Sequence, residues 1–138
     1  MIFDDIDHHL ALAGSIDLAA VPIGIYLAWC VNLGLVSEAL LKDAEQQILR
    51  VRYRDASPAD LLVSGCGGRI ESAHLNERGL AFTKSNYQRY LTTYQRLFAS
   101  QPYSNEDSWG RYDRIAPIVT GWLLGRSESR KPWWKFWS

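Results

Sequence analysis

The most distinctive pattern in the sequence is a run of twenty residues without a charge, Leu18–Ser37, which reads LAAVPIGIYLAWCVNLGLVS. A membrane span needs about 20 predominantly apolar residues, so the length alone is compatible with one. The flanking residues Asp17 and Glu38 are acidic, however, whereas Lys and Arg are typical of cytoplasmic flanks. We therefore expect a buried core helix that begins at Pro22, a favourable first-turn residue, and ends at Gly34. An interfacial segment and a true span are the alternatives.

Four further helices are predicted by capping residues followed by apolar positions at a spacing of three and four. Ser37 begins one that extends to Val51, and Ser57 begins a short one that ends in the glycines of residues 65–68. The two longest are expected at residues 76–100 and 108–124. A proline at position 117 should kink or split the last of these, because an internal proline removes a hydrogen bond. The pattern predicts an all-α, single-domain bundle of about five helices around the buried apolar helix.

The helix expected at residues 76–100 carries an aromatic stripe on one face. Aromatic side chains interleaved with Lys and Arg can bind a nucleic acid single strand by stacking on its bases. Helical periodicity, however, explains the stripe as part of the core without any ligand. We favour the core and expect no nucleic acid partner. The stripe consists of Tyr87, Tyr90, Leu91, Tyr94, Leu97 and Phe98.

The composition divides the chain into a helical domain, residues 1–125, and a basic, tryptophan-rich tail, residues 126–138. A chain of 138 residues, 47% of them hydrophobic, is long enough to bury the core of one domain. The tail, with its WWKFW sequence, is expected to dock on the bundle, to contact a partner or a second copy of the chain, or to touch a membrane surface. Stable membrane insertion is not expected.

The distribution of charge indicates one class of partner, and the N-terminus and the cysteines indicate the compartment. Net charge is zero, but residues 1–49 hold seven acids and one lysine, so the first third is acidic and the remainder basic. This asymmetry either steers a charged partner or is compensated within the fold. The N-terminus lacks the pattern of a secretory signal, and Cys30 and Cys66 have no disulfide or metal spacing. We therefore expect a cytoplasmic protein with two free thiols.

Candidate catalytic chemistry is sparse, and we expect neither an enzyme nor a cofactor. His8 and His9 lie near three aspartates, but adjacent residues point apart on a regular backbone and no second cluster completes a ligand set, so no metal site is predicted. Cys66 lacks a histidine placed to act as its base. The acids around Trp109 fit a helix N-terminus, where Asp107 would be favoured by the helix dipole.

Several motifs resemble a bacterial domain family of uncharacterised function. They are the FDD sequence at residues 3–5 with His8 and His9, IGIYLAW at residues 23–29, LNERG at residues 75–79, and Trp109 with YDRIAP at residues 112–117. The resemblance covers roughly residues 3–122 in the right order. The chain departs from the pattern at Leu33, which separates Asn32 from Gly34, and in its tail, which inherits no role.

The resemblance is to a family without a known reaction, so its functional implication rests on analogy. Small helical cytoplasmic proteins of this kind look like the immunity proteins encoded beside bacterial secreted toxins, which bind one toxin domain and block its active site. An acidic surface suits a basic toxin domain, and aromatic residues amid acids are typical interface anchors. The expected partner surface consists of Asp4, Asp5, Asp7, His8, Glu106, Asp107, Trp109, Tyr112 and Asp113.

Two other functions remain open from the sequence. One is a ligand-binding or enzymatic domain whose pocket lies between helices, with polar groups supplied near Asp113. The other is a membrane-peripheral adaptor that uses the tail. The aromatic residues expected to line the inter-helix pocket are Tyr26, Trp29, Tyr90, Tyr94 and Trp109.

Overall fold

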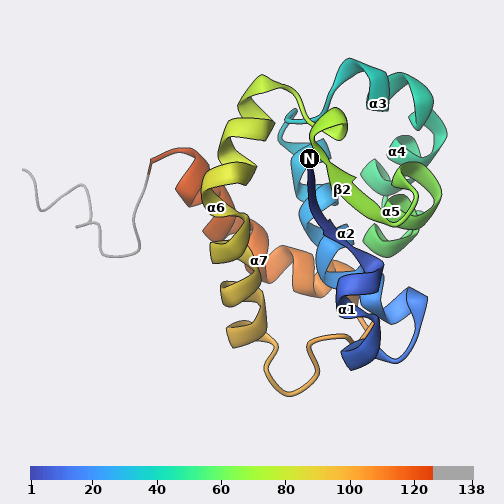
Figure 1. Cartoon of the computed structure of the whole chain (residues 1–138), viewed down its shortest axis with the longest axis vertical. Coiled ribbons are helices and arrows are strands. Elements are labelled where there is room, and N and C mark those ends of the chain that lie inside the picture. The colour runs from blue at the N-terminus through green and yellow to red at the C-terminus, as the bar shows by residue number, and fades with distance from the viewer. Residues whose placement is uncertain (126–138) are drawn as a thin grey trace, which may run out of the picture.

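The computed structural model describes residues 1–125 and is mostly helical (Figure 1). The tail beyond Gly125 lies outside the described residues, and so do its predicted contacts with a second copy or a membrane. Among the helices of residues 1–125, none is long and apolar enough to cross a membrane. The elements are β1 (Ile2–Asp5), α1 (Ile6–Ala13), α2 (Ile16–Asn32), α3 (Glu38–Asp43), α4 (Glu45–Arg52), α5 (Pro58–Cys66), β2 (Arg69–Glu71), the 3₁₀ helix η1 (Ser72–His74), α6 (Glu77–Leu97) and α7 (Ser108–Leu123).

Helix α2 forms the centre of the molecule, as the uncharged run predicts. Figure 1 shows it between α6 and α7 on one side and α3, α4 and α5 on the other. Its residues from Ala19 to Val31 are all buried. The predicted start at Pro22 is wrong, because the helix begins at Ile16 with Ser15 as its cap and Pro22 lies inside it. The Pro22 carbonyl accepts a hydrogen bond from the Tyr90 hydroxyl at 2.5 Å, which ties α2 to α6.

The other predicted helices are confirmed with changes in their boundaries. The segment after Ser37 forms two helices, α3 and α4, because Ala44 leaves the helical region with φ −115° and ψ 30°. Helix α5 begins after Ser57 as predicted, with a capping box between Ser57 and Asp60, and ends at Gly67, whose φ of 67° lies in the left-handed region that suits glycine. Helix α7 remains one helix with Pro117 inside it. Residues 1–125 therefore form seven α-helices, more than the five predicted.

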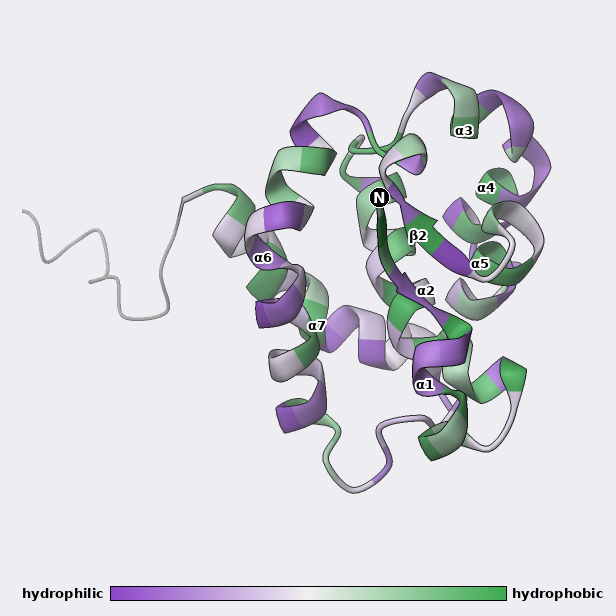
Figure 2. Ribbon diagram, viewed as in Figure 1, coloured by the Kyte–Doolittle hydropathy of each residue, from purple (hydrophilic) through white to green (hydrophobic). Residues whose placement is uncertain are grey.

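A small antiparallel sheet, missed by the sequence analysis, makes the fold other than purely α. β1 pairs with β2, with Asp4 opposite Ile70 and Asp5 opposite Arg69. In Figure 2, β2 alternates purple, green and purple, which is the alternation of a strand with one buried face. An irregularity of register between residues 2 and 4 marks a β-bulge, and bulges redirect side chains along a strand. Asp4 beside this bulge is buried.

The aromatic stripe of α6 is core, as favoured from the sequence. Its tyrosine rings pack against Tyr26, whose centroid lies 5.0 Å from that of Tyr87 and 4.9 Å from that of Tyr90. Tyr94 is also fully buried, 6.1 Å from Tyr90. Four of the five residues predicted to line an inter-helix pocket, Tyr26, Trp29, Tyr90 and Tyr94, are thus buried core residues.

Candidate functional site

A buried carboxylate, Asp4, is the centre of a polar network at the junction of β1 and α1. Its Oδ2 accepts hydrogen bonds from the Tyr87 hydroxyl at 2.6 Å and from His9 Nε2 at 2.8 Å. Its Oδ1 accepts from His8 Nδ1 at 2.9 Å and from the Asp5 amide at 2.9 Å. These contacts join the N-terminal strand to α1 and α6 and supply the partners that a buried charge requires.

The network keeps Asp4 ionised. Burial acts to raise the pKa of Asp4, but the hydrogen bonds from His9, Tyr87 and His8 outweigh it and lower the pKa below its usual value. Tyr87 responds in the opposite direction: burial, followed by the negative charge of Asp4, raises the pKa of its hydroxyl well above normal. Tyr87 is therefore a neutral donor to an anionic Asp4.

The two histidines converge, contrary to the expectation that adjacent side chains point apart. Their ring centroids are 4.9 Å apart, because Asp4 lies within reach of both rings. His9 is buried and its Nδ1 is 2.7 Å from the Tyr103 hydroxyl, whereas the His8 side chain is 66% exposed. Donor atoms of Asp4, His8 and His9 all lie within 4.8 Å of one another.

The order Asp4–His9–Tyr103 is that of an orienting acid, a base and a nucleophile. Activation of a nucleophile requires a lowered pKa or an effective base, but burial and the charge of Asp4 raise the pKa of Tyr103. The hydroxyl is therefore held in its neutral form.

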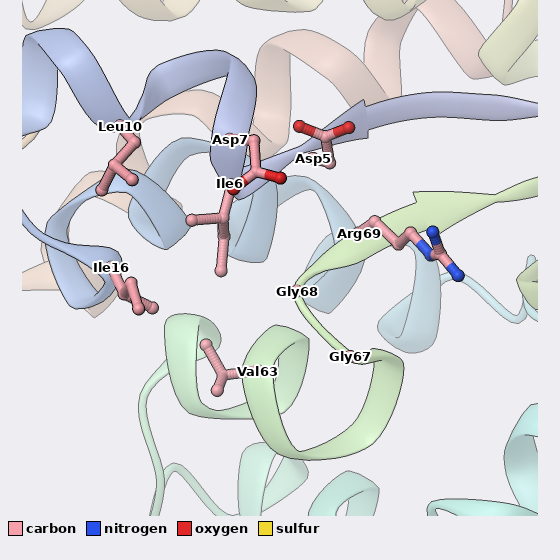
Figure 3. Close-up of a pocket in the computed structure, with 9 residues that line it drawn as sticks. All are labelled: Asp5, Ile6, Asp7, Leu10, Ile16, Val63, Gly67, Gly68 and Arg69. Carbon is pink, nitrogen blue, oxygen red and sulfur yellow. The ribbon is translucent and has the colours of Figure 1, made fainter.

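A second feature, which we call the acidic surface, lies where α1, α2, α5 and the loop before α7 meet. Three neighbouring hollows form this surface: the first lies beside α1, the second beside α5 and the third beside the loop before α7. Val63 lines both the first and the second hollow, and Asn105 lines both the second and the third. Figure 3 shows the first, of about 400 Å³, with Asp5 and Asp7 on one rim and Ile16 and Val63 at its apolar wall. The carboxylates that line the three hollows are Asp5, Asp7, Asp17, Asp60 and Glu106.

Large apolar side chains accompany these acids at the surface. Leu12 is 80% exposed, Ile16 56% and Val63 38%. One base, Arg69, lines the same hollows, and its Nε is already paired with Glu71 at 3.0 Å. Within residues 1–125, no salt bridge involves any of the five carboxylates of the acidic surface. The surface therefore combines free negative charge with exposed apolar area.

A third group surrounds Arg54, which has a φ of 58°. Its guanidinium binds both carboxylate oxygens of Asp113, at 2.6 and 3.0 Å, and lies over the rings of Trp109 and Tyr112. The hydrogen bond and charge of Arg54 lower the pKa of Asp113 below normal. The indole of Trp109 donates to the Ala56 carbonyl at 3.2 Å, so this group fixes the loop before α5 onto α7.

The predicted partner residues therefore fall into different environments. Asp5, Asp7 and Glu106 lie on the acidic surface, with His8 exposed on the same helix as Asp7. Asp107 caps α7, as the dipole argument favoured, through its Oδ1 and the Gly110 amide at 3.1 Å. The remaining four are engaged within the molecule: Asp4 and Tyr112 are buried, while Trp109 and Asp113 are bound to residues 54–56.

Sequence reasoning missed three features of the site. Tyr87 was assigned to the core stripe with no role for its hydroxyl, and Tyr103 was not considered. Asp17 and Asp60 were not assigned to the partner surface, because Asp17 was interpreted only as an acidic flank of the uncharged run and Asp60 only as part of the helix start at Ser57. An acid in the first turn is a capping signal that says nothing about its neighbours in space.

Fold and site together define a small helical protein with a buried Asp–His–Tyr network beside an exposed acidic surface. The chain belongs to the domain family of unknown function DUF7832, whose model matches residues 2–107. The match fits the expectation of an uncharacterised family, but the motif expected at residues 109–117 lies outside the matched range. No curated protein and no solved structure matches the chain.

Proposed function

We propose that this protein is a cytoplasmic immunity protein that binds and neutralises a cognate bacterial secreted toxin domain. The observation that carries the proposal is the acidic surface, where five carboxylates that form no salt bridge within residues 1–125 lie beside exposed apolar side chains. Interfaces between proteins combine an apolar centre with a polar rim, and complementary charge directs the partners together. The proposal also rests on the analogy between this family and immunity proteins.

The chemistry of the acidic surface favours a basic partner. Asp7 and Glu106 are exposed near opposite ends of the three hollows, so a partner that covers the hollows meets both carboxylates. Leu12 and Ile16 supply the apolar area that such contact buries. A toxin domain that acts on nucleic acid or nucleotides presents a basic surface, and covering that surface blocks its substrate.

Four of the residues first predicted for the partner surface are left out of the proposal. Asp4 and Tyr112 are buried. Arg54 lies over the Trp109 ring and forms a salt bridge with Asp113, so both side chains already have a partner within the molecule. The burial of Tyr26, Trp29, Tyr90 and Tyr94 in the core gives no support to an inter-helix ligand pocket. The acidic surface therefore carries the proposal by itself.

The test first asks whether a toxin-domain protein is encoded beside this chain in its native genome, as the proposal requires, and then uses that protein. Co-purification with the full-length chain should yield a complex of equal amounts, and co-expression should restore growth to cells that produce the toxin domain. Asp7→Lys with Glu106→Lys should weaken the complex by at least about tenfold, because charge reversal places like charges opposite each other.

The matched control is Asp43→Lys with Asp55→Lys, which changes net charge equally at exposed acids away from the three hollows. It should bind like the wild type and still restore growth. The proposal is overturned if the wild-type chain neither binds nor protects, or if the Asp7 and Glu106 variant does both as well as the control.

A further inference from the structure

The arrangement of Asp4, His8 and His9 has the composition of a transition-metal site. Zinc takes nitrogen from histidine at about 2.0–2.1 Å and oxygen from carboxylates at about 2.0–2.2 Å, so tetrahedral donor atoms lie roughly 3.3 Å apart. Here the His9 Nε2–Asp4 Oδ2 and His8 Nδ1–Asp4 Oδ1 separations are 2.8 and 2.9 Å, and all three residues offer donors within 4.8 Å. The two separations are somewhat shorter than the tetrahedral value and run to different oxygens of Asp4, so the histidine rings would move slightly apart when an ion binds.

The surroundings of the three residues are those of supported metal ligands. A ligating histidine usually has its other ring nitrogen hydrogen-bonded, which fixes the tautomer and the ring orientation. His9 meets this condition, because its Nδ1 lies 2.7 Å from the Tyr103 hydroxyl. The Tyr87 hydroxyl donates to Asp4 Oδ2 at 2.6 Å, and Tyr87 is buried in α6. The carboxylate is thus oriented by a rigid neighbour.

The network is half open, which distinguishes it from a closed structural anchor. Asp4 and His9 are buried, but the His8 side chain is 66% exposed. An ion therefore has a route from solvent through His8, and a fourth coordination position remains for water. His8 donates to Asp4 from the solvent side of the group, so one of the three ligand side chains stays within reach of an ion.

We propose that Asp4, His8 and His9 bind one divalent transition-metal ion of the zinc type. Asp4 contributes a carboxylate oxygen, His8 its Nδ1 and His9 its Nε2. When the ion binds, each neutral imidazole changes tautomer, so that the nitrogen that now donates to Asp4 becomes a metal ligand and the other nitrogen carries the proton. His9 Nδ1 then donates to the Tyr103 oxygen and His8 Nε2 to solvent. Tyr87 continues to donate to Asp4.

The test titrates the full-length chain, freed of metal by a chelator, with Zn²⁺ in competition with a chromophoric chelator. One equivalent should bind, and Co²⁺ in its place should give the intense visible absorption of a four-coordinate site. His8→Ala should reduce the affinity by at least about tenfold, the scale of loss when even a supporting residue is removed. His8 is exposed, so this variant keeps its fold.

His74→Ala is the control, because His74 is the third and last histidine of the chain and is not a member of this group. It should bind Zn²⁺ like the wild type. Tyr103→Phe, which removes the partner of His9 Nδ1, should weaken binding without abolishing it. The proposal is overturned if the wild type binds no stoichiometric Zn²⁺ at micromolar protein, or if His8→Ala binds as tightly as His74→Ala.

Discussion

At the residue scale, Asp4 shows how a local change in the backbone alters the role of a side chain. An Asp-Asp pair near the start of a chain is usually solvated, and no pattern in the sequence distinguishes Asp4 from Asp5. The β-bulge and the turn into α1 separate them: Asp5 caps the helix, while Asp4 is buried against Tyr87. Neither the bulge nor the strand partner at residues 69–71 is encoded near Asp4, so its burial could not be predicted.

The Tyr87 hydroxyl provides a direct measure of this network. Tyr87→Phe keeps the ring in the core and removes one of the side-chain donors to a buried carboxylate. A hydrogen bond to a charged group contributes about 1.5–3 kcal/mol, so the free energy of unfolding should fall by about that amount. Chemical denaturation of the two proteins measures the difference.

The control for that substitution is Tyr53→Phe, since Tyr53 is 76% exposed. Surface changes of this kind usually stay within about 0.5 kcal/mol. Equal midpoints for the two variants would contradict the role assigned to the Tyr87 hydroxyl.

At the element scale, the long periodic segments were the predictable ones. The uncharged run and the caps at residues 76 and 57 identified α2, α6 and α5, because each signal lies within or directly beside the element that it defines. The strands were missed because β1 and β2 are short and each depends on a partner more than sixty residues away. The interior position of Pro22 was missed for a similar reason, since its carbonyl is satisfied by Tyr90 of α6.

The crossing of α2 and α5 depends on a glycine. A Cβ added to Gly24 would lie 2.5 Å from the Pro58 carbonyl oxygen, a backbone atom that cannot move alone. Gly24→Ala should therefore lower the free energy of unfolding by about 1–3 kcal/mol, the usual cost of overpacking, although alanine is the better helix former. Thermal denaturation provides the measurement.

Gly121→Ala in α7 is the matched control, because a Cβ there meets no atom within 4 Å. It should leave stability unchanged or raise it by up to about 1 kcal/mol, the helix preference of alanine over glycine. Stabilisation by both substitutions would show that the helices do not approach as closely as described.

At the scale of the whole molecule, the mostly helical character and the central helix could be predicted, whereas the sheet could not and the candidate site could be predicted only in part. Asp5, Asp7 and Glu106 were identified through charge, and they lie on the acidic surface. Asp17 and Asp60 join them only because α2 and α5 bring them there. Periodicity identifies which residues are buried within one helix, but it does not say which exposed residues of different helices become neighbours.

The two thiols report on opening of the whole domain. Burial, with a smaller contribution from Glu71, raises the pKa of Cys66 to about 12, and burial raises the pKa of Cys30 as well. Both are therefore poor nucleophiles at pH 8. Cys66 is the last residue of α5 and becomes accessible when that helix end frays, whereas Cys30 lies in α2 and requires global unfolding.

Alkylation with iodoacetamide at pH 8, followed by mass spectrometry of the peptides, should show Cys66 modified first and Cys30 at the slower rate of global opening. In denaturant both should react at similar rates. Equal rates for the two thiols in the native protein would contradict the central, closed position of α2.

The packing of α7 onto α2 has a consequence for where the family's domain ends. The family model stops at residue 107, one residue before α7 begins. Yet Thr120 accepts a hydrogen bond from the Trp29 indole at 2.9 Å, and Tyr112 accepts one from the Asn32 amide at 2.8 Å. Truncation at the family boundary would remove α7 and expose the side of α2 that α7 covers. The unit that similarity detects is thus shorter than the unit that folds, and relatives should be compared and expressed with the segment equivalent to residues 108–123 attached.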